Sequence, residues 1–172
     1  MSAEPRHFEP SADRTADLRR AFGCFGTGVT VVTVQTDAGP LGMTANSFSS
    51  VSLTPPLVLW SPALSSARHD AFARAATFCI HVLSDRQLEM ARHFAQTGDG
   101  FDQFDWTPGP LGAPRLAGCL AEFHCSTHAI HPAGDHSLIL GEVQHVIEGR
   151  LDASGLLFDR GRFGRFSDDV SG

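Results

Sequence analysis

The chain of 172 residues contains no tyrosine, only four cysteines and no apolar segment as long as a membrane span. A transmembrane helix needs about 20 consecutive apolar residues. The N-terminus has neither the apolar segment nor the small-residue cleavage site of a secretion signal. We therefore expect a cytoplasmic protein with no membrane partner.

Clusters of positive charge are also missing. The 13 basic residues are scattered in runs no longer than a pair, and the formal net charge is -6. Nucleic acids and anionic lipids are recognised by concentrated positive charge. We expect no nucleic-acid partner, and a small-molecule role is favoured.

The cysteines and histidines, which could bind a metal, show no spacing typical of a metal site. No Cys-x-x-Cys pair suggests zinc or a dithiol centre, and we interpret the cysteines as buried structural thiols: Cys24, Cys79, Cys119 and Cys125. The densest histidine group is His124, His128 and His131. On a strand, the first two would stand about 13 Å apart, too far to hold one ion. We expect no bound metal.

The common nucleotide and hydrolase motifs are absent as well. Gly23, Gly26 and Gly28 have the wrong order for a dinucleotide-binding loop, and no Gly-Lys-Ser/Thr follows a glycine cluster. No Gly-x-Ser-x-Gly occurs, so a hydrolase triad would lack any local motif. A Rossmann domain is therefore not expected.

The sequence does contain a succession of short strand patterns. Strands are predicted from Val and Thr enrichment, apolar runs or period-two alternation at residues 29–36, 41–53, 57–60, 77–83, 121–129 and 137–147. Helices are predicted at residues 11–22 (with Ser11 as a possible cap), 65–74 and 85–95, the last preceded by a capping box at residues 84–87. Consecutive strands without regular helix alternation favour an antiparallel β-barrel of the β-rich (α+β) class, with two to three attached helices.

The chain length suits a single domain. We expect a flexible N-terminal arm over residues 1–10, the barrel domain over residues 11–167 and a C-terminal tail over residues 168–172. Residues 98–118 are rich in Gly, Pro and Asp, yet they include Phe101, Phe104 and Trp106. This composition predicts a packed lid and not a linker.

Three places have side chains suited to a ligand. The small polar residues of segment 43–53 can address the carbonyls and ring nitrogens of a flat heterocycle, although a solvated hairpin would have the same composition. Segment 61–68 enters a predicted helix with hydroxyls and an arginine, which suits a phosphate or is a plain helix cap. The turn at residues 134–136 places a histidine at the start of an apolar strand, where it can contact a ligand or be structural.

Taken together, the ordered motifs resemble the flavin reductase-like family, which has an FMN-binding split barrel and supplies the reductase components of two-component flavin-dependent monooxygenases. The resemblance extends over about residues 19–166. It rests on residues 25–33, 42–59, 90–95 and 134–136.

The resemblance implies roles for individual residues. The flavin ring and ribityl chain would contact Thr44, Ala45, Asn46, Ser47, Ser50, Val51 and Ser52. The flavin phosphate would be held near Ser61, Ser65, Ser66 and Arg68. Phe94 would lie near the flavin, unless it is a core residue of its helix. His136 would face the nicotinamide and position it, as the one residue given a catalytic role. Arg165 and Phe166 belong to the closing segment, which often presents an aromatic residue to the nicotinamide.

The implied activity is an NAD(P)H-dependent flavin reductase, in which hydride passes from NADH or NADPH to FMN or FAD. Because the chain has no tyrosine, a phenolic hydroxyl can have no role. The resemblance also implies a homodimer, since the barrel is too small to enclose a flavin, and a partner monooxygenase that receives the reduced flavin. Two alternatives remain open: a flavin-bound reductase of a metal ion or corrinoid, and a non-catalytic flavin-binding redox module.

Overall fold

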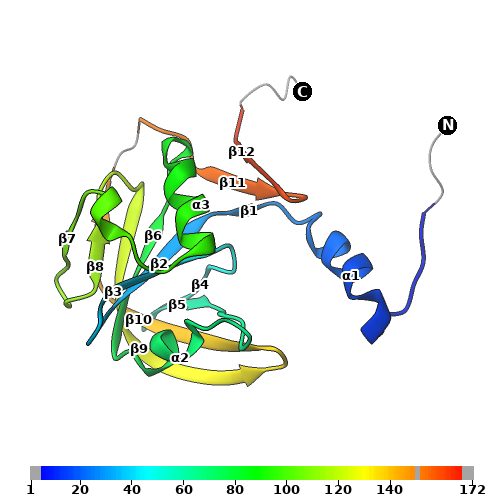
Figure 1. Ribbon diagram of the computed structural model, residues 1–172, viewed down its shortest axis with the longest axis horizontal. Helices are drawn as coiled ribbons and strands as arrows, with labels where there is room; N and C mark the ends of the chain where they lie inside the picture. The colour runs from blue at the N-terminus through cyan, green and yellow to red at the C-terminus, as the bar shows by residue number, and fades with distance from the viewer. Residues whose placement is uncertain (1–4, 150–151, 168–172) are drawn as a thin grey trace.

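The structure is a computed structural model that describes residues 5–149 and 152–167. The predicted C-terminal tail, residues 168–172, and the first four residues of the predicted arm lie outside the described residues. The main feature is a seven-stranded antiparallel sheet with the order β3-β2-β6-β9-β10-β5-β4 (Figure 1). Its strands, in chain order, are β2 (Thr30–Thr36), β3 (Gly39–Ala45), β4 (Ser49–Leu53), β5 (Pro56–Trp60), β6 (Thr77–Val82), β9 (Ala121–Ala133) and β10 (His136–Glu148).

The two edge strands of this sheet, β3 and β4, are joined by only residues 46–48. Such a short link spans at most about 14 Å, so the sheet must curl until its edges stand side by side. This arrangement confirms the predicted split barrel. The continuous strand predicted over residues 41–53 is wrong, because the side chain of Ser47 bonds to the backbone of Ser61 and the strand ladder is interrupted there.

Two smaller sheets complete the fold. β1 (Thr27–Gly28), β11 (Leu156–Asp159) and β12 (Arg162–Arg165) form a three-stranded sheet in the order β1-β11-β12. β7 (Trp106–Pro108) pairs with β8 (Pro114–Leu116) within the predicted lid. Phe101 is only 4% exposed and packs in the core with Leu116, so the prediction of a packed segment is confirmed.

The helices are shorter than the sequence predicts at their N-termini. The first consists of a 3-10 turn (Ala12–Arg14) and α1 (Thr15–Phe22), and Ser11 bonds to Asp13 instead of capping the helix. The second, α2, covers only His69–Arg74 because the amide of Leu64 bonds to the β9–β10 turn at Asp135. The third begins with a 3-10 turn (Asp85–Gln87) and continues as α3 (Leu88–Gln96); its predicted capping box at Ser84 is confirmed.

The core has two parts because β2 is buried on both faces. Val31 packs into one cluster with Phe94 and Leu83, beside α3. Val32 packs into the other with Trp60 and Phe78, in the barrel interior. Helix α1 contributes no buried residue and projects to one side of the barrel with the N-terminal arm (Figure 1). No helix among the described residues is long and apolar enough to cross a membrane.

Candidate functional site

The break between β3 and β4 borders two neighbouring cavities. One, of about 170 Å³, is lined by Thr44, Ala45 and Asn46 together with four apolar residues: Val29, Ala95, Phe158 and Phe163. The other, of about 240 Å³, lies toward α1 and is also lined by Asn46 and Phe158. Asn46 and Phe158 therefore stand where the two cavities meet.

The hydrogen bonds of this stretch separate its residues into two kinds. Thr44 Oγ1 donates to the carbonyl of Ala91 in α3 over 2.7 Å, and the amide of Ser61 donates to Ser47 Oγ over 2.9 Å. These two hydroxyl groups fix the backbone on either side of Asn46. Asn46 is exposed and, among the described residues, its side chain forms no hydrogen bond, so its amide is free for a ligand.

The remaining residues of the predicted flavin stretch lie on the edge strand β4. Ser50 and Val51 are exposed there, and Ser52 Oγ accepts a hydrogen bond from the Thr54 amide over 3.2 Å. A bulge between Ser50 and Ser52 interrupts their pairing with β5. The structure thus brings Thr44, Ala45 and Asn46 into one cavity, whereas Ser50, Val51 and Ser52 line neither of the two cavities at Asn46.

Arg68 has a structural role that the sequence did not indicate. Its Nη1 donates to the carbonyl oxygens of Gly42 (2.9 Å), Phe94 (2.8 Å) and Thr97 (3.0 Å), and so fastens β3 to the end of α3. Partial burial lowers the pKa of the guanidinium. The helix predicted to start at Ser65 starts at His69, so its predicted N-terminus is wrong, whereas the phosphate contact of this segment stays a prediction. Ser65 remains exposed, whereas Ser66 Oγ accepts the Arg68 amide over 3.3 Å.

Phe94 lies in the core. Its side chain has 0% exposure, and its ring centroid lies 4.9 Å from that of Phe101. A Cβ on Gly42 would come within 2.5 Å of the Phe94 ring, so only glycine fits against it. Phe94 is therefore a core residue, and its contact with the flavin stays a prediction.

His136 stands at the tip of the β9–β10 hairpin, half-exposed, with Nδ1 2.8 Å from the Asp135 carboxylate. The tip packs against the loop after β5, where Ala63 pairs with His136. The hydrogen bond with His136 lowers the pKa of Asp135, and the charge of Arg19 lowers it further. Arg19, in α1, lines the cavity that contains Asn46.

The predicted closing segment borders a third cavity, which shares Phe163 with the 170 Å³ cavity. Arg165 is 3.5 Å from the Asp85 carboxylate and lines a cavity of about 250 Å³ with Phe163. Phe166 is 64% exposed. His136 lines neither this cavity nor those at Asn46. None of these three cavities is therefore lined by both His136 and Arg165.

Several lining residues were missed by the sequence analysis. Phe158 and Phe163 face each other across the β11–β12 hairpin, with ring centroids 5.0 Å apart. Apolar residues on both sides of Arg160-Gly161, which both have positive φ, are the pattern of a tight hairpin. This signal predicts the hairpin, but no local pattern indicates that it packs beside Asn46.

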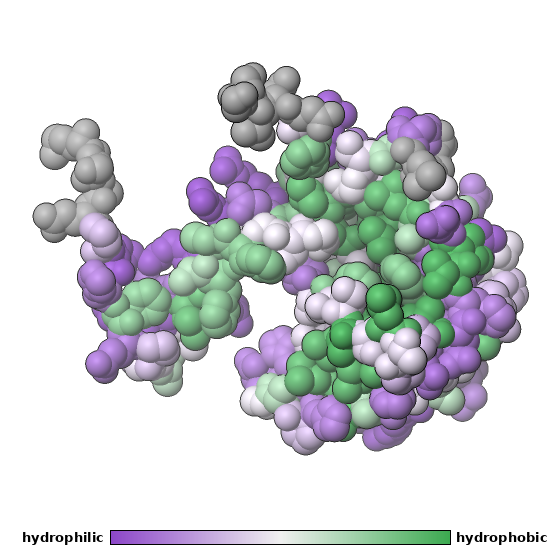
Figure 2. Space-filling model, turned by 180° about the vertical axis from the view of Figure 1, so that it is seen from behind, coloured by the Kyte–Doolittle hydropathy of each residue, from purple (hydrophilic) through white to green (hydrophobic). Residues whose placement is uncertain are grey.

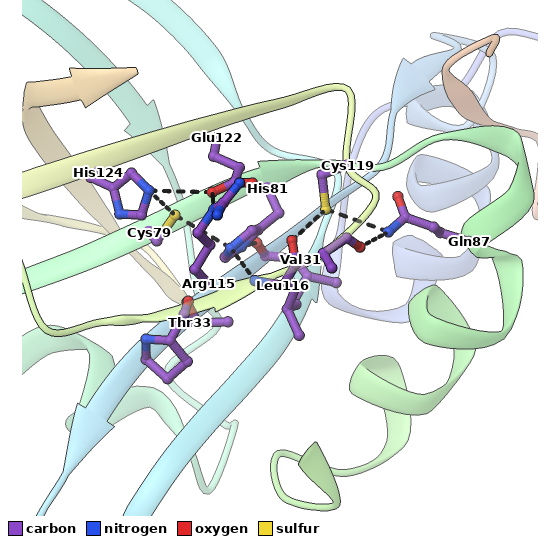
Figure 3. Close-up of polar contacts among 12 residues, drawn as sticks. Val31, Thr33, Cys79, His81, Gln87, Arg115, Leu116, Cys119, Glu122 and His124 are labelled. Atoms are coloured by element: carbon purple, nitrogen blue, oxygen red, sulfur yellow. Dashed lines mark hydrogen bonds and ion pairs between the residues drawn. The ribbon is translucent and has the colours of Figure 1, made fainter. Parts of the chain in front are cut away.

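A buried polar cluster lies away from these cavities and contacts Arg115 and Leu116 of β8 (Figure 3). Cys79, His81 and Glu122 place potential metal ligands within 4.8 Å of one another. They converge through the pairing of β6 with β9, which the sequence analysis did not consider.

The ligand atoms of this cluster already serve protein contacts (Figure 3). His81 Nδ1 lies 3.0 Å from the Val31 carbonyl, and its Nε2 accepts the Leu116 amide over 3.0 Å. Arg115 Nε donates to the Glu122 carboxylate over 2.7 Å. The absence of a bound metal stays a prediction.

The structure tests the interpretation of the cysteines as buried thiols. Cys79, Cys119 and Cys125 are buried, and burial raises the pKa of all three thiols. Cys24 is exposed, so the interpretation is wrong for this residue. It follows the projecting helix α1, where no part of the barrel covers it.

Comparison with known proteins gives consistent matches over nearly the whole chain. The family model described as the flavin reductase like domain matches residues 22–167. The FMN reductase (NADH) SmoA of Agrobacterium fabrum is 51% identical over 93% of this chain and 91% of its own length. The reductase subunit HsaB of a flavin-dependent monooxygenase from Rhodococcus jostii is 40% identical over 85% of this chain and 75% of its own length.

A solved structure agrees in fold as well as in sequence. The NADH:FAD oxidoreductase SgcE6 of Streptomyces globisporus, in complex with NAD and FAD fragments, superposes with a TM-score of 0.87 at 43% identity. The match covers 95% of this chain and 99% of that chain.

Proposed function

The chain belongs to the flavin reductase-like family, and we propose that it is an NADH-dependent flavin reductase that transfers hydride to FMN or FAD and supplies reduced flavin to a flavin-dependent monooxygenase. The observation that carries the proposal is the free amide of Asn46, at the meeting point of two cavities with a Phe158–Phe163 wall. A flat heterocycle needs such a combination of apolar wall and few polar contacts.

The residues present fit a flavin ring. Ala45 leaves room for a ring to approach the backbone, and the amide of Asn46 offers both donors and an acceptor to its polar edge. Phe158 and Phe163 provide the apolar side. When bound, a flavin would supply N5 as the acceptor for the hydride of nicotinamide C4. The protein's task is to hold the two rings at contact distance and to exclude water.

His136 is assigned to the nicotinamide side as a positioning residue. Its Nδ1 is engaged by Asp135, which fixes the orientation of the ring and leaves Nε2 free. Because none of the three cavities is lined by both His136 and Arg165, a nicotinamide site that includes both residues would need a second copy to bring the two segments together.

The surface supports such a homodimer. Phe22 and Phe25, at the end of α1, are 68% and 79% exposed, and the edge strand β4 exposes Val51 and Leu53. Figure 2 shows that the arm and α1 project from the barrel and that an open notch separates them from it. Apolar patches lie on the projecting part and on the barrel. A second copy that covers these patches would remove a large apolar surface from water.

A cytoplasmic location is also part of the proposal. The cysteines are free thiols, Cys24 among them on the surface, and thiols persist in reducing compartments.

The test is anaerobic mixing of NADH with the flavin-loaded protein while the visible absorbance of the flavin is recorded. Rapid bleaching supports a reductase, whereas binding of flavin without bleaching indicates the non-catalytic redox module. Repeating the assay with an excess of free flavin distinguishes the remaining alternative. Multiple turnovers of free flavin support delivery to a monooxygenase, and a single turnover indicates a bound flavin that reduces another acceptor.

A further inference from the structure

A series of hydrogen bonds joins the tip of the β9–β10 hairpin to α2, which lies beside that hairpin (Figure 1). His69, the first residue of α2, has its Nε2 2.9 Å from Ser137 Oγ and its Nδ1 3.0 Å from the Asp70 carboxylate. Ser137 directly follows His136 in β10. The series therefore ends beside the residue assigned to the nicotinamide.

The partners of the His69 ring decide where its proton lies. The hydrogen bond with His69 lowers the pKa of Asp70, which keeps this carboxylate ionised. An ionised carboxylate only accepts hydrogen bonds, so Nδ1 carries the hydrogen and donates it to Asp70. In the neutral ring, Nε2 then accepts the hydroxyl hydrogen of Ser137. The bond between His69 and Ser137 therefore has a defined direction.

The order serine, histidine, aspartate is also that of a hydrolase triad, but an acyl substrate could not reach this serine. Ser137 is 6% exposed, and its amide donates to the Pro62 carbonyl over 3.1 Å, so this amide is not free to stabilise an oxyanion. Ser137 also lines none of the three cavities described above. The bond with His69 therefore serves to hold Ser137 and not to activate it.

Holding Ser137 sets the direction of His136. Successive side chains of a strand point to opposite faces. Ser137 shares its face of β10 with Ile139, which packs in the barrel interior, whereas 42% of the His136 side chain is exposed. A shift by one residue would exchange the two faces. His69 therefore keeps His136 on the outer face by engaging Ser137 on the inner one.

The other contacts of the tip involve only the backbone. The amide of Leu64 donates to the Asp135 carbonyl over 2.9 Å, and Ala63 pairs with His136. These contacts place the turn against the loop after β5. Among the described residues, His69 is the only side chain that bonds to the side chain of Ser137. It is therefore the contact that fixes a side chain at the tip.

We propose that His69 is a positioning residue of the reductase reaction, which holds Ser137 on the inner face of β10 and thereby directs His136 toward the nicotinamide. His69 does not contact the reacting atoms itself. This inference rests on the proposed function, because it assigns the support of a residue in the same reaction. The effect of His69 must pass through His136, so it cannot exceed the loss caused by His136→Ala.

The kinetic test uses two pairs of variants. Ser137→Ala and His69→Leu remove the hydrogen bond, whereas Ser137→Thr keeps the hydroxyl and His69→Gln keeps an acceptor. The first two should each lower kcat/KM for NADH about threefold to tenfold, the scale of one hydrogen bond. The loss should lie mainly in a higher KM, with the dissociation constant of FMN unchanged. Ser137→Thr and His69→Gln should recover at least part of it.

Two controls separate positioning from a general loss of stability. In a His136→Ala background, Ser137→Ala should cause no further kinetic loss, because the residue through which it acts is gone. His81→Gln is the matched control, since His81 is also a buried histidine, but its ring nitrogens contact Val31 and Leu116 and not the hairpin tip. It should lower the thermal unfolding midpoint and leave the KM for NADH unchanged.

A second readout does not depend on turnover. In flavin-free protein that contains isotope-labelled histidine, the ring signal of His136 in the NMR spectrum is identified by its loss in His136→Ala. This signal should shift in Ser137→Ala and in His69→Leu, because the ring leaves its fixed position. It should stay in place in His81→Gln.

The inference is overturned if Ser137→Ala leaves either the kinetics or the His136 signal unchanged, or if its kinetic effect persists in full in the His136→Ala background. Where His69→Leu does not fold, Ser137→Ala decides alone, since it removes a single oxygen atom. Failure of the proposed function has a different appearance. NADH then does not bleach the flavin of the unmodified protein, while the His136 signal still responds to Ser137→Ala.

Discussion

Ser47 Oγ accepts a hydrogen bond from the amide of Ser61 over 2.9 Å, and this contact ties the break between β3 and β4 to the loop that follows β5. The two residues belong to segments that are far apart in the sequence and were each predicted to contact the same ligand. Their bond also orients Asn46, the residue next to Ser47, toward the two cavities. The candidate ligand site therefore lies at the interruption between β3 and β4, where the Ser47–Ser61 hydrogen bond replaces strand pairing.

The first prediction concerns Asn46. Asn46→Leu should weaken flavin binding by about 1 to 3 kcal/mol, because a polar edge of the ligand would lose its partner. The measurement is a fluorescence titration of FMN and of FAD. Gln35→Leu removes an exposed amide from β2, away from the cavities, and should leave both affinities unchanged. An Asn46→Leu titration that coincides with this control would contradict the assignment.

Much of the barrel could be predicted from the sequence, because Val- and Thr-rich segments and the Ser84 capping box are local patterns. The same holds for the turn at residues 134–136. The break at residues 46–48 could not be predicted, since it depends on Ser61, a residue outside the strand. The convergence of Cys79, His81 and Glu122 was missed for a similar reason, namely that only the register of β6 against β9 brings them together.

The candidate site was predicted in part. Asn46 lines its cavities as a ligand residue should, but the walls of these cavities come from Phe158 and Phe163, which have no motif. Arg68 has a tertiary role that its local sequence did not indicate. Its position after two serines suggested a phosphate contact, whereas the fold uses its guanidinium to bind carbonyl oxygens at the end of α3. Local composition predicts which side chains are available, and the tertiary contacts decide which of them remain free.

His136 provides the second prediction. His136→Ala should lower kcat/KM for NADH by about tenfold to a hundredfold, or about 1.4 to 2.7 kcal/mol, while flavin affinity changes little. This loss is smaller than that expected for an essential acid, base or nucleophile. Stopped-flow reduction of the flavin-loaded variant separates the hydride step from nicotinamide binding.

His131→Ala is a suitable control for His136, because His131 is an exposed histidine of the same hairpin. It should have unchanged kinetics. If His136→Ala also reduces flavin at the unmodified rate with the same dependence on NADH, then His136 is structural. The nicotinamide site would then be sought around Arg165 and Phe166.

The third prediction is that Arg68→Met destabilises the fold. The carbonyl oxygens of Gly42, Phe94 and Thr97 would lose their donor, and we expect the free energy of unfolding in urea to fall by about 2 to 4 kcal/mol. Arg74→Met, which removes an exposed ion pair with Asp70, should change it by less than about 1 kcal/mol. If Arg68 also binds phosphate, the folded variant will in addition lose affinity for FMN relative to riboflavin.

The fourth prediction is the homodimer. Light scattering should give twice the 18.4 kDa mass of one chain. The double variant Phe22→Asp, Phe25→Asp should shift the mass toward one chain, because burying each phenylalanine contributes about 1.5 to 3 kcal/mol. Val146→Asp places one aspartate at a 53% exposed position on β10, away from α1, and should remain dimeric. A monomeric unmodified protein that binds flavin tightly would contradict the prediction.

The last prediction concerns pH and the buried His81. Burial lowers the pKa of His81 to about 4, below its ordinary value of 6.5, and its contacts with Val31 and Leu116 require the neutral ring. Between these two pH values the unfolded chain binds a proton that the folded chain does not, so stability must rise with pH in this window. The stabilisation that comes from keeping His81 neutral is complete above pH 6.5 and is lost as the pH falls toward 4. It amounts to about 3 kcal/mol over the whole window.

Urea unfolding of the unmodified protein should therefore give a free energy about 2 kcal/mol lower at pH 5 than at pH 7 from this residue alone. His81→Gln should be less stable at pH 7, because glutamine cannot reproduce both contacts, yet its stability should change less between the two pH values. His131→Gln, at an exposed position, should keep the full pH dependence. If His81→Gln and His131→Gln lose the same free energy on acidification, the acid sensitivity arises elsewhere and His81 is not the group that titrates.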